Sequence, residues 1–182
     1  MSPTTSSATA RPAATVAEVC VAGIHVMASG DRAAFDGLVH PDAVNHEARD
    51  EPPACRVPGP DGFHATALWL RAAFAELAFE VHEVVAQDDV VAVHLTMRGR
   101  HTGDFVVHAP DGSVADVFPP RGRTFAVTQS HWFRMRDGLV VEHRANRDDL
   151  GMAKQLGWVP PTPVYLARMA AARRRARRAA RA

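Results

Sequence analysis

Residues 130–157 read SHWFRMRDGLVVEHRANRDDLGMAKQLG, and this stretch decides the fold. Two runs of alternating apolar and polar residues flank Asp137-Gly138. An Asp-Gly pair in that setting is the strongest short-range signal for a β-hairpin. The second run leads directly into a short helical pattern over 149–156, which Gly157 would end. We therefore predict two antiparallel strands, 123–136 and 139–148, followed by a short helix.

The turn also predicts which side chains share a face of the hairpin. With Asp137 and Gly138 as the loop, Arg136 faces Leu139, and the same register sets Arg144 opposite His131. Because side chains two residues apart on a strand share a face, one face would carry five polar groups: Gln129, His131, Arg144, Asn146 and Asp148. So many polar groups inside a hairpin indicate the wall of a solvated pocket. Trp132 has the opposite parity and would face outward, where such a sheet can pack against a second subunit.

The rest of the chain places helices before strands. Apolar residues recur at helical spacing in three early segments, and the period changes to two after residue 78. Helices are expected over 16–28, 31–38 and 61–77, and Asp31 and Asp61 would cap the second and third of them. Strands are expected over 79–86 and 90–99. A further short strand over 105–108 would lie within a long loop. A polar, proline-rich loop is expected between His40 and Pro60. This order predicts an α+β fold in which a curved, mixed or antiparallel sheet wraps three N-terminal helices as a cone and encloses a pocket.

Composition separates two tails from the folded part. Residues 1–14 are small, polar and proline-containing, so we expect a disordered tail there. Residues 15–158 would form the domain, and 159–182 a proline-containing linker with an Arg-rich tail. All 20 acidic residues lie between Glu18 and Asp149, whereas seven Arg follow residue 165. From Val164 onward the tail has the composition of a cationic helix. Without interleaved aromatic residues or a large apolar face it specifies neither a nucleic acid nor a membrane, and a solvated tail touching the acidic body is the simpler interpretation.

Several functional classes lack their motifs in this sequence. No apolar run reaches the length of a membrane span, and we expect a cytoplasmic protein. Cys20 and Cys55 show no metal spacing and are expected to be reduced thiols. The histidines follow no HExxH or comparable pattern, and no glycine-rich nucleotide loop or GxSxG motif occurs. We therefore expect neither a metal nor another cofactor.

Five segments together resemble one family. They are SGDRAAFDGLVHPDAVNHE, GPDGFHATALWLRAAFAEL, RGRHTGDF, PPRGRTFAV and DGLVVEHRANRDDLGMAKQLG. Over about residues 15–158 the chain resembles the SnoaL-like polyketide cyclases, also called ester cyclases. These belong to the nuclear transport factor 2-like, or cystatin-like, superfamily of α+β cones. The closing pattern, an E-H pair followed by Asp and then QLG, is the most specific part of the resemblance.

The resemblance implies an enzyme of secondary metabolism, such as antibiotic biosynthesis. It would bind a polyketide-like or other aromatic ester and close a ring by a cofactor-free intramolecular aldol condensation. A single Asp at the end of the last long strand would be the general acid/base, and by position this is Asp148. The family usually has Trp where this chain has Arg144, so either the ligand is more polar or Arg144 tunes Asp148. A homodimer or homotetramer formed through the outer sheet face is also expected.

The expected site thus has three catalytic candidates, Asp148, His131 and His46. A further set would bind the substrate: Arg144, Asn146, Gln129, Trp69 and Phe74. A buried carboxylate would have a raised pKa, although a nearby Arg would oppose this, and a neutral His131 could polarise a carbonyl group. Each candidate also has a plain structural explanation: Asp148 as a helix cap, His131 as a core histidine, His46 as a surface residue. Alternative functions are an isomerase, an epoxide hydrolase, a dehydratase or a non-catalytic ligand-binding cone.

Overall fold

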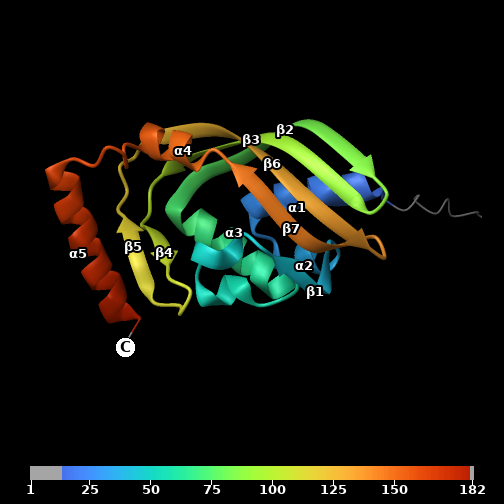
Figure 1. Cartoon of the computed structure of the whole chain (residues 1–182), viewed down its shortest axis with the longest axis horizontal. Coiled ribbons are helices and arrows are strands. Elements are labelled where there is room, and N and C mark those ends of the chain that lie inside the picture. Colours follow the sequence, from blue (N-terminus) through green and yellow to red (C-terminus); the bar gives the residue numbers. More distant parts are fainter. Residues whose placement is uncertain (1–13, 181–182) are drawn as a thin grey trace, which may run out of the picture.

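The computed structural model describes residues 14–180 and shows an α+β fold (Figure 1). The predicted tail over 1–14 lies outside the described residues except for Ala14. The helices are α1 (Val16–Ser29), α2 (Arg32–Asp36), α3 (Pro60–Ala73), α4 (Asp149–Leu156) and α5 (Pro163–Ala179), with 3-10 turns η1 (Ala48–Asp50) and η2 (Pro53–Arg56). The strands are β1 (Val39–Asn45), β2 (Phe74–Gln87), β3 (Val90–His101), β4 (Phe105–His108), β5 (Val114–Phe118), β6 (Thr124–Arg136) and β7 (Leu139–Arg147).

Five strands form one curved sheet in the order β1-β7-β6-β3-β2. β1 runs parallel to β7, and the other neighbours are antiparallel. Figure 1 shows the sheet bending around α1 and α3, and β4 and β5 forming a separate pair beside α5. The main core lies between the sheet and these helices, with Phe35, Phe74 and Leu95 among its fully buried side chains. The predicted cone-shaped α+β fold is confirmed.

Local capping explains where the helices begin and end. Thr15 and Glu18 form a capping box at the start of α1, and Gly30 ends that helix with a φ of 69°. Asp31 caps α2 through Ala33 N–H, as predicted. Gly157 ends α4 in the same way, with a φ of 70°. Glycine is the usual residue after the last turn of a helix because it adopts a positive φ without steric strain.

The hairpin turn is where the sequence places it, but the register changes close to the turn. Asp137 and Gly138 both have positive φ, 53° and 78°, and join β6 to β7. Met135 pairs with Val140, yet Arg134 pairs with Glu142, so Val141 is an extra residue, a β-bulge. From that point every residue of β7 faces the side opposite to the one predicted.

Two element boundaries in the N-terminal half differ from the prediction. The third helix ends at Ala73, not Leu77, because Phe74 is already extended and pairs with His101 in the sheet. Gly59 occupies the position before α3, and Asp61 instead binds Arg32. The expected loop over 40–60 contains most of β1, an edge strand that tolerates Pro41 because no strand within residues 14–180 pairs with its outer side.

The cationic C-terminal segment is a helix, as predicted, and it packs on the small sheet. Ala172 of α5 is buried against Val114 and Val117. Tyr165 donates its hydroxyl hydrogen to the Pro119 carbonyl at 3.1 Å, and Arg173 lies 3.4 Å from Asp116. Within residues 14–180, no helix is both long and apolar enough to cross a membrane.

Candidate active site

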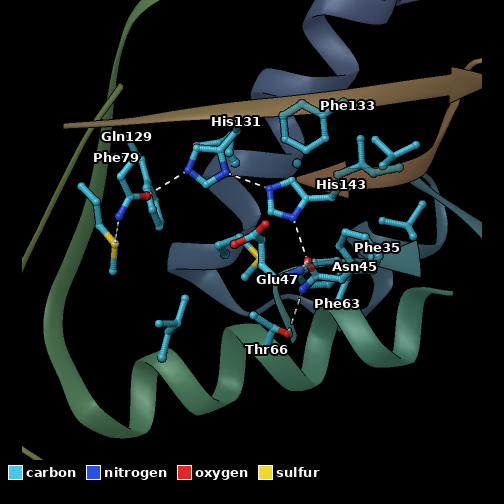
Figure 2. A pocket seen from close by; sticks show the side chains of 18 of the residues that line it. Phe35, Asn45, Glu47, Phe63, Thr66, Phe79, Gln129, His131, Phe133 and His143 are labelled. Carbon is cyan, nitrogen blue, oxygen red and sulfur yellow. Dashed lines mark hydrogen bonds between the residues drawn. The ribbon is translucent and has the colours of Figure 1, made fainter. Parts of the chain in front are cut away.

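Two adjoining cavities lie between the concave face of the sheet and the helices. The inner cavity, about 90 Å³, is enclosed by apolar side chains of α1, α2 and α3 together with a group of polar ones (Figure 2). The outer cavity, about 260 Å³, has five aromatic residues in its lining: Trp69, Phe74, Phe105, Phe118 and Trp158. Together they approach the size of a small-molecule site. The residues common to both are Glu47, Glu51, Trp69, Leu70, Met97, Gln129 and Arg147.

Hydrogen bonds join four polar residues across the inner cavity, as Figure 2 shows. Nε2 of His131 lies 2.9 Å from Oε1 of Gln129, and its Nδ1 lies 2.9 Å from Nε2 of His143. Nδ1 of His143 is in turn 2.9 Å from Oδ1 of Asn45. Gln129 and His131 come from β6, His143 from β7 and Asn45 from the end of β1, so the sheet itself sets the spacing.

The same chain of contacts continues to a buried carboxyl group. Asn45 Nδ2 lies 3.5 Å from Thr66 Oγ1, and the Thr66 hydroxyl donates to Oε2 of Glu51 at 2.5 Å. Thr66 projects from α3, and Glu51 follows η1. We call the six residues the polar chain; they are Gln129, His131, His143, Asn45, Thr66 and Glu51. It links the sheet to α3 through groups that all lie along the inner cavity.

The cavity environment shifts the proton affinities of this chain. Burial lowers the pKa of His131 to about 4, with the positive charge of Arg147 adding to the effect. Burial also holds the pKa of His143 well below its ordinary value. In contrast, burial raises the pKa of Glu51 to about 7, against the opposing effects of the Thr66 hydrogen bond and Arg147. At neutral pH both imidazoles are therefore neutral, and the Glu51 carboxyl is close to half ionised.

The two neutral imidazoles carry one N–H each, but their ring nitrogens make three close contacts. Asn45 Oδ1 accepts from the Glu47 N–H at 3.2 Å, which fixes the amide oxygen toward Nδ1–H of His143. The one N–H of a neutral His131 then serves either His143 or the Gln129 oxygen, but not both. The remaining nitrogen of His131 consequently keeps a lone pair that can accept a hydrogen bond from a ligand hydroxyl group.

Four of the predicted site residues do line these cavities. Gln129 and His131 are buried on the inner face of β6, and Trp69 lines both spaces. Phe74 lines the outer cavity and contacts Phe105, with ring centroids 5.5 Å apart. The outward orientation predicted for Trp132 is confirmed, since this side chain is 47% exposed.

The prediction that Arg144 and Asn146 face the pocket is wrong. The bulge at Val141 turns both onto the outer face of β7, where Arg144 pairs across the strands with Trp132. The Arg144 side chain is 64% exposed and lies 3.3 Å from Glu142. The same change sets Ala145 opposite His131, where the predicted register had placed Arg144, and brings His143 onto the cavity face opposite Phe133. Arg144 is thus placed neither to contact a ligand in these cavities nor to tune an acid there.

His46 and Asp148 also lie away from both cavities. The His46 side chain is 40% exposed and is 3.4 Å from Glu142 on the protein surface. Asp148 is exposed and caps α4, accepting the Gly151 N–H at 2.8 Å. The predicted pocket position of Asp148 fails for the same reason as that of Arg144, because the register beyond the bulge is shifted by one residue.

The cap position of Asp148 leads to a testable prediction. Asp148→Ala should lower the free energy of unfolding by about 1 kcal/mol, the usual cost of losing an N-cap, and Asp148→Asn should lower it by much less. Neither change should reduce the turnover of a ligand held in the cavities. Urea unfolding and product formation would check both statements. A loss of turnover in a normally stable Asp148→Asn variant would restore the catalytic role predicted from the sequence.

Sequence reasoning misses several residues of the site. Glu51 lies in a segment that the sequence predicts to be a loop, and no periodicity points to it. His143 is found only when the bulge is known, because it then shares a face with His131. Asn45 and Glu47 are visible in the sequence only as neighbours of His46, and Arg147 faces the cavities for the same reason as His143.

Neither cysteine pairs with the other, and no cluster of metal ligands is evident within the described part of the chain. Cys20 and Cys55 are both buried free thiols. Burial raises the pKa of each thiol to about 12. Among residues 14–180, no three His, Cys, Asp or Glu side chains come together in a way that could hold a metal ion.

Comparison with known proteins gives a consistent result. The family model described as SnoaL-like polyketide cyclase matches residues 17–156. An aklanonic acid methyl ester cyclase of Streptomyces peucetius is 35% identical over 127 residues, which cover 69% of this chain and 79% of the relative. The nogalonic acid methyl ester cyclase of Streptomyces nogalater is 31% identical, over 67% and 82%. Among solved structures, IdmH from Streptomyces antibioticus superposes with a TM-score of 0.60 at 30% identity, covering 79% of this chain and 99% of IdmH.

Proposed function

The chain belongs to the SnoaL-like polyketide cyclase family, and from this premise we propose that it closes a ring in a polyketide ester by a cofactor-free intramolecular aldol reaction. The observation that carries the proposal is the polar chain, which crosses a two-part cavity whose other lining residues are mostly apolar. A site for aldol chemistry needs apolar walls for the carbon skeleton and a few fixed polar groups for the carbonyl oxygens. The aromatic outer cavity and the histidine-lined inner cavity supply these two parts.

The reaction consumes no cofactor and no second substrate. A base removes a proton from a carbon next to a carbonyl group, and the electron pair moves to that oxygen as an enolate. The enolate carbon then attacks a ketone carbon in the same molecule, so that one C–C bond forms and the ketone oxygen takes up a proton. The product of this addition is an isomer of the substrate.

The polar chain suits the electrostatic demands of these steps. Because the pKa of His131 is lowered to about 4, its imidazole is neutral at neutral pH and offers a nitrogen lone pair to a hydroxyl group of the substrate. Gln129, which lines both cavities, carries an uncharged amide N–H donor. A fixed neutral donor of this kind stabilises an enolate oxygen as the charge develops. Since general acid/base catalysis supplies only about 10²–10⁴ in rate, the walls must also hold the two carbons near each other.

The proposed function predicts turnover of the esters on which relatives are named to act. We expect the protein to convert aklanonic acid methyl ester or nogalonic acid methyl ester into a product of unchanged mass and altered retention time. Liquid chromatography with mass spectrometry on the purified protein measures this directly. A protein that binds both esters without converting either would contradict the proposal and favour a ligand-binding cone.

Two further expectations concern the protein as a whole. We propose that it works in the cytoplasm on a small-molecule substrate and assembles as a homodimer or homotetramer through the outer face of the sheet. Trp132, exposed on that face beside Arg144, supports the second point, because a large exposed aromatic side chain favours burial against a partner.

A further inference from the structure

Glu51 is the most unusual ionisable group in the two cavities. It is only 3% exposed although it carries a carboxyl group, and it lines both the inner and the outer cavity. Its backbone is held in place by Arg56, whose guanidinium donates to the Glu51 carbonyl at 2.9 Å and to the carbonyls of Ala109 and Pro110 at 2.8 Å. A carboxyl buried at the junction of two cavities, on an anchored turn, is a costly arrangement that calls for a function.

The other acidic groups that line the cavities are engaged or exposed. Within residues 14–180 these are Glu47, Asp50 and Asp149. Glu47 accepts the Ala145 N–H at 3.0 Å, and its other oxygen lies 3.6 Å from Arg147. Asp149 lies 3.5 Å from the same Arg147, and Asp50 is exposed. Among these cavity-lining acids of the described chain, Glu51 alone combines burial with the absence of an ion pair.

We propose that Glu51 is the catalytic base and acid of the ring closure, and that Thr66 is its positioning residue. This inference rests on the proposed cyclase function and names the residue that performs its proton transfers. The carboxylate takes the proton from the carbon next to the carbonyl group. After the C–C bond has formed, the Glu51 carboxylic acid returns that proton to the ketone oxygen, so Glu51 ends in its starting state.

The surroundings of Glu51 match this role. The groups facing it are the hydroxyl of Thr66, the thiol of Cys55, the cation of Arg147 and the carboxylate of Glu47. Burial outweighs the charge of Arg147 and raises the pKa of Glu51 to about 7, which suits a base working near neutral pH. The polar chain then connects Glu51, through Thr66 and Asn45, to the two histidines that line the inner cavity.

Exchange of the carbon-bound proton tests the proposal apart from ring closure. The native protein and Glu51→Gln are incubated with aklanonic acid methyl ester in D₂O, and deuterium uptake and cyclised product are followed by mass spectrometry. We expect Glu51→Gln to lower both rates about 10²–10⁴-fold with KM nearly unchanged. Glu51→Asp should retain part of the activity. Glu80→Gln, which removes an exposed carboxylate paired with Arg98 outside the lining of both cavities, is the matched control and should behave like the native protein.

The pH profile separates a catalytic from a merely structural role. In the native protein, kcat/KM should rise with pH to a plateau with a midpoint near pH 7, and this rise should be absent in the residual activity of Glu51→Gln. Because the Thr66 hydroxyl lowers the pKa of Glu51, Thr66→Val should move the midpoint to higher pH and Thr66→Ser should restore it.

The possible outcomes distinguish the role of Glu51 from the cyclase function. Full activity in Glu51→Gln would overturn the role of Glu51 while leaving the cyclase function intact. Deuterium exchange that depends on Glu51, without ring closure, would support Glu51 as the base and contradict the proposed product. A native protein that promotes neither exchange nor closure would contradict both.

Discussion

Glu51→Gln is expected to be more stable than the native protein at pH 8 and equally stable at pH 4. Burial raises the pKa of Glu51 from the ordinary 4.5 to about 7 in the folded state. Since each pKa unit corresponds to about 1.4 kcal/mol, the ionised carboxylate destabilises the fold by about 3 kcal/mol above pH 7. A neutral Gln removes this penalty, and urea unfolding of both proteins at the two pH values measures it.

The sign of this effect follows from the protonation states. Below about pH 4 the carboxyl is protonated in both the folded and the unfolded chain, so ionisation contributes nothing. As pH rises through 4.5 toward 7, the unfolded chain ionises first and the folded state loses stability. Glu80→Gln, a change at an exposed carboxylate, should show no such pH-dependent gain. A Glu51→Gln variant that is less stable than the native protein at pH 8 would mean that the folded protein stabilises the ionised carboxylate, which would contradict a raised pKa.

Insertion of one Ala between Glu142 and His143 is expected to be the most damaging single change in the hairpin. With the bulge at Val141 kept, the inserted residue would take the place opposite Phe133, and every later residue of β7 would move by one position. His143 and Arg147 would turn outward, and Arg144 and Asn146 would turn into the apolar cavity. Burial of an unpaired Arg is strongly unfavourable, so we expect a loss of about 3 kcal/mol or more, together with loss of ligand turnover.

A substitution that keeps the chain length is the control. Val141→Ala keeps the number of residues and hence the bulge. Because the Val141 side chain is only half-buried, this substitution should lower the free energy of unfolding by only about 1 kcal/mol. Urea unfolding and product formation compare the two variants. An insertion variant with native stability and activity would contradict the role of the β7 register in selecting the residues of the site.

Much of the fold could be predicted from local sequence signals. The Asp137-Gly138 turn, α4 with its end at Gly157, the cap at Asp31 and the cationic helix α5 all depend on residues close together in sequence. The cone followed from the order of helices and strands and from the family resemblance. The predicted helix α3 is too long because Phe74-Ala-Glu-Leu77 continues a helical pattern, whereas pairing of Phe74 with His101 is a long-range contact.

The candidate site could be predicted only in part, because it depends on long-range geometry. A bulge at Val141 has no local signature in a run of apolar residues, yet it exchanges Arg144 for His143 in the cavity wall. β1, which carries Asn45, pairs with the distant strand β7. Its own sequence contains Pro41 and therefore predicts a loop. Glu51 resembles any loop carboxyl until the fold buries it beside Thr66.

The position of a bound ester tests the central claim, that Glu51 performs the proton transfers, most directly. A crystal structure of Glu51→Gln with aklanonic acid methyl ester should show the ligand spanning both cavities. The carbon that loses its proton should lie within hydrogen-bond reach of the residue 51 amide, and the neighbouring carbonyl oxygen should face the Gln129 amide. A ligand whose reactive carbon lies against Asp148, or outside the two cavities, would contradict the catalytic role of Glu51.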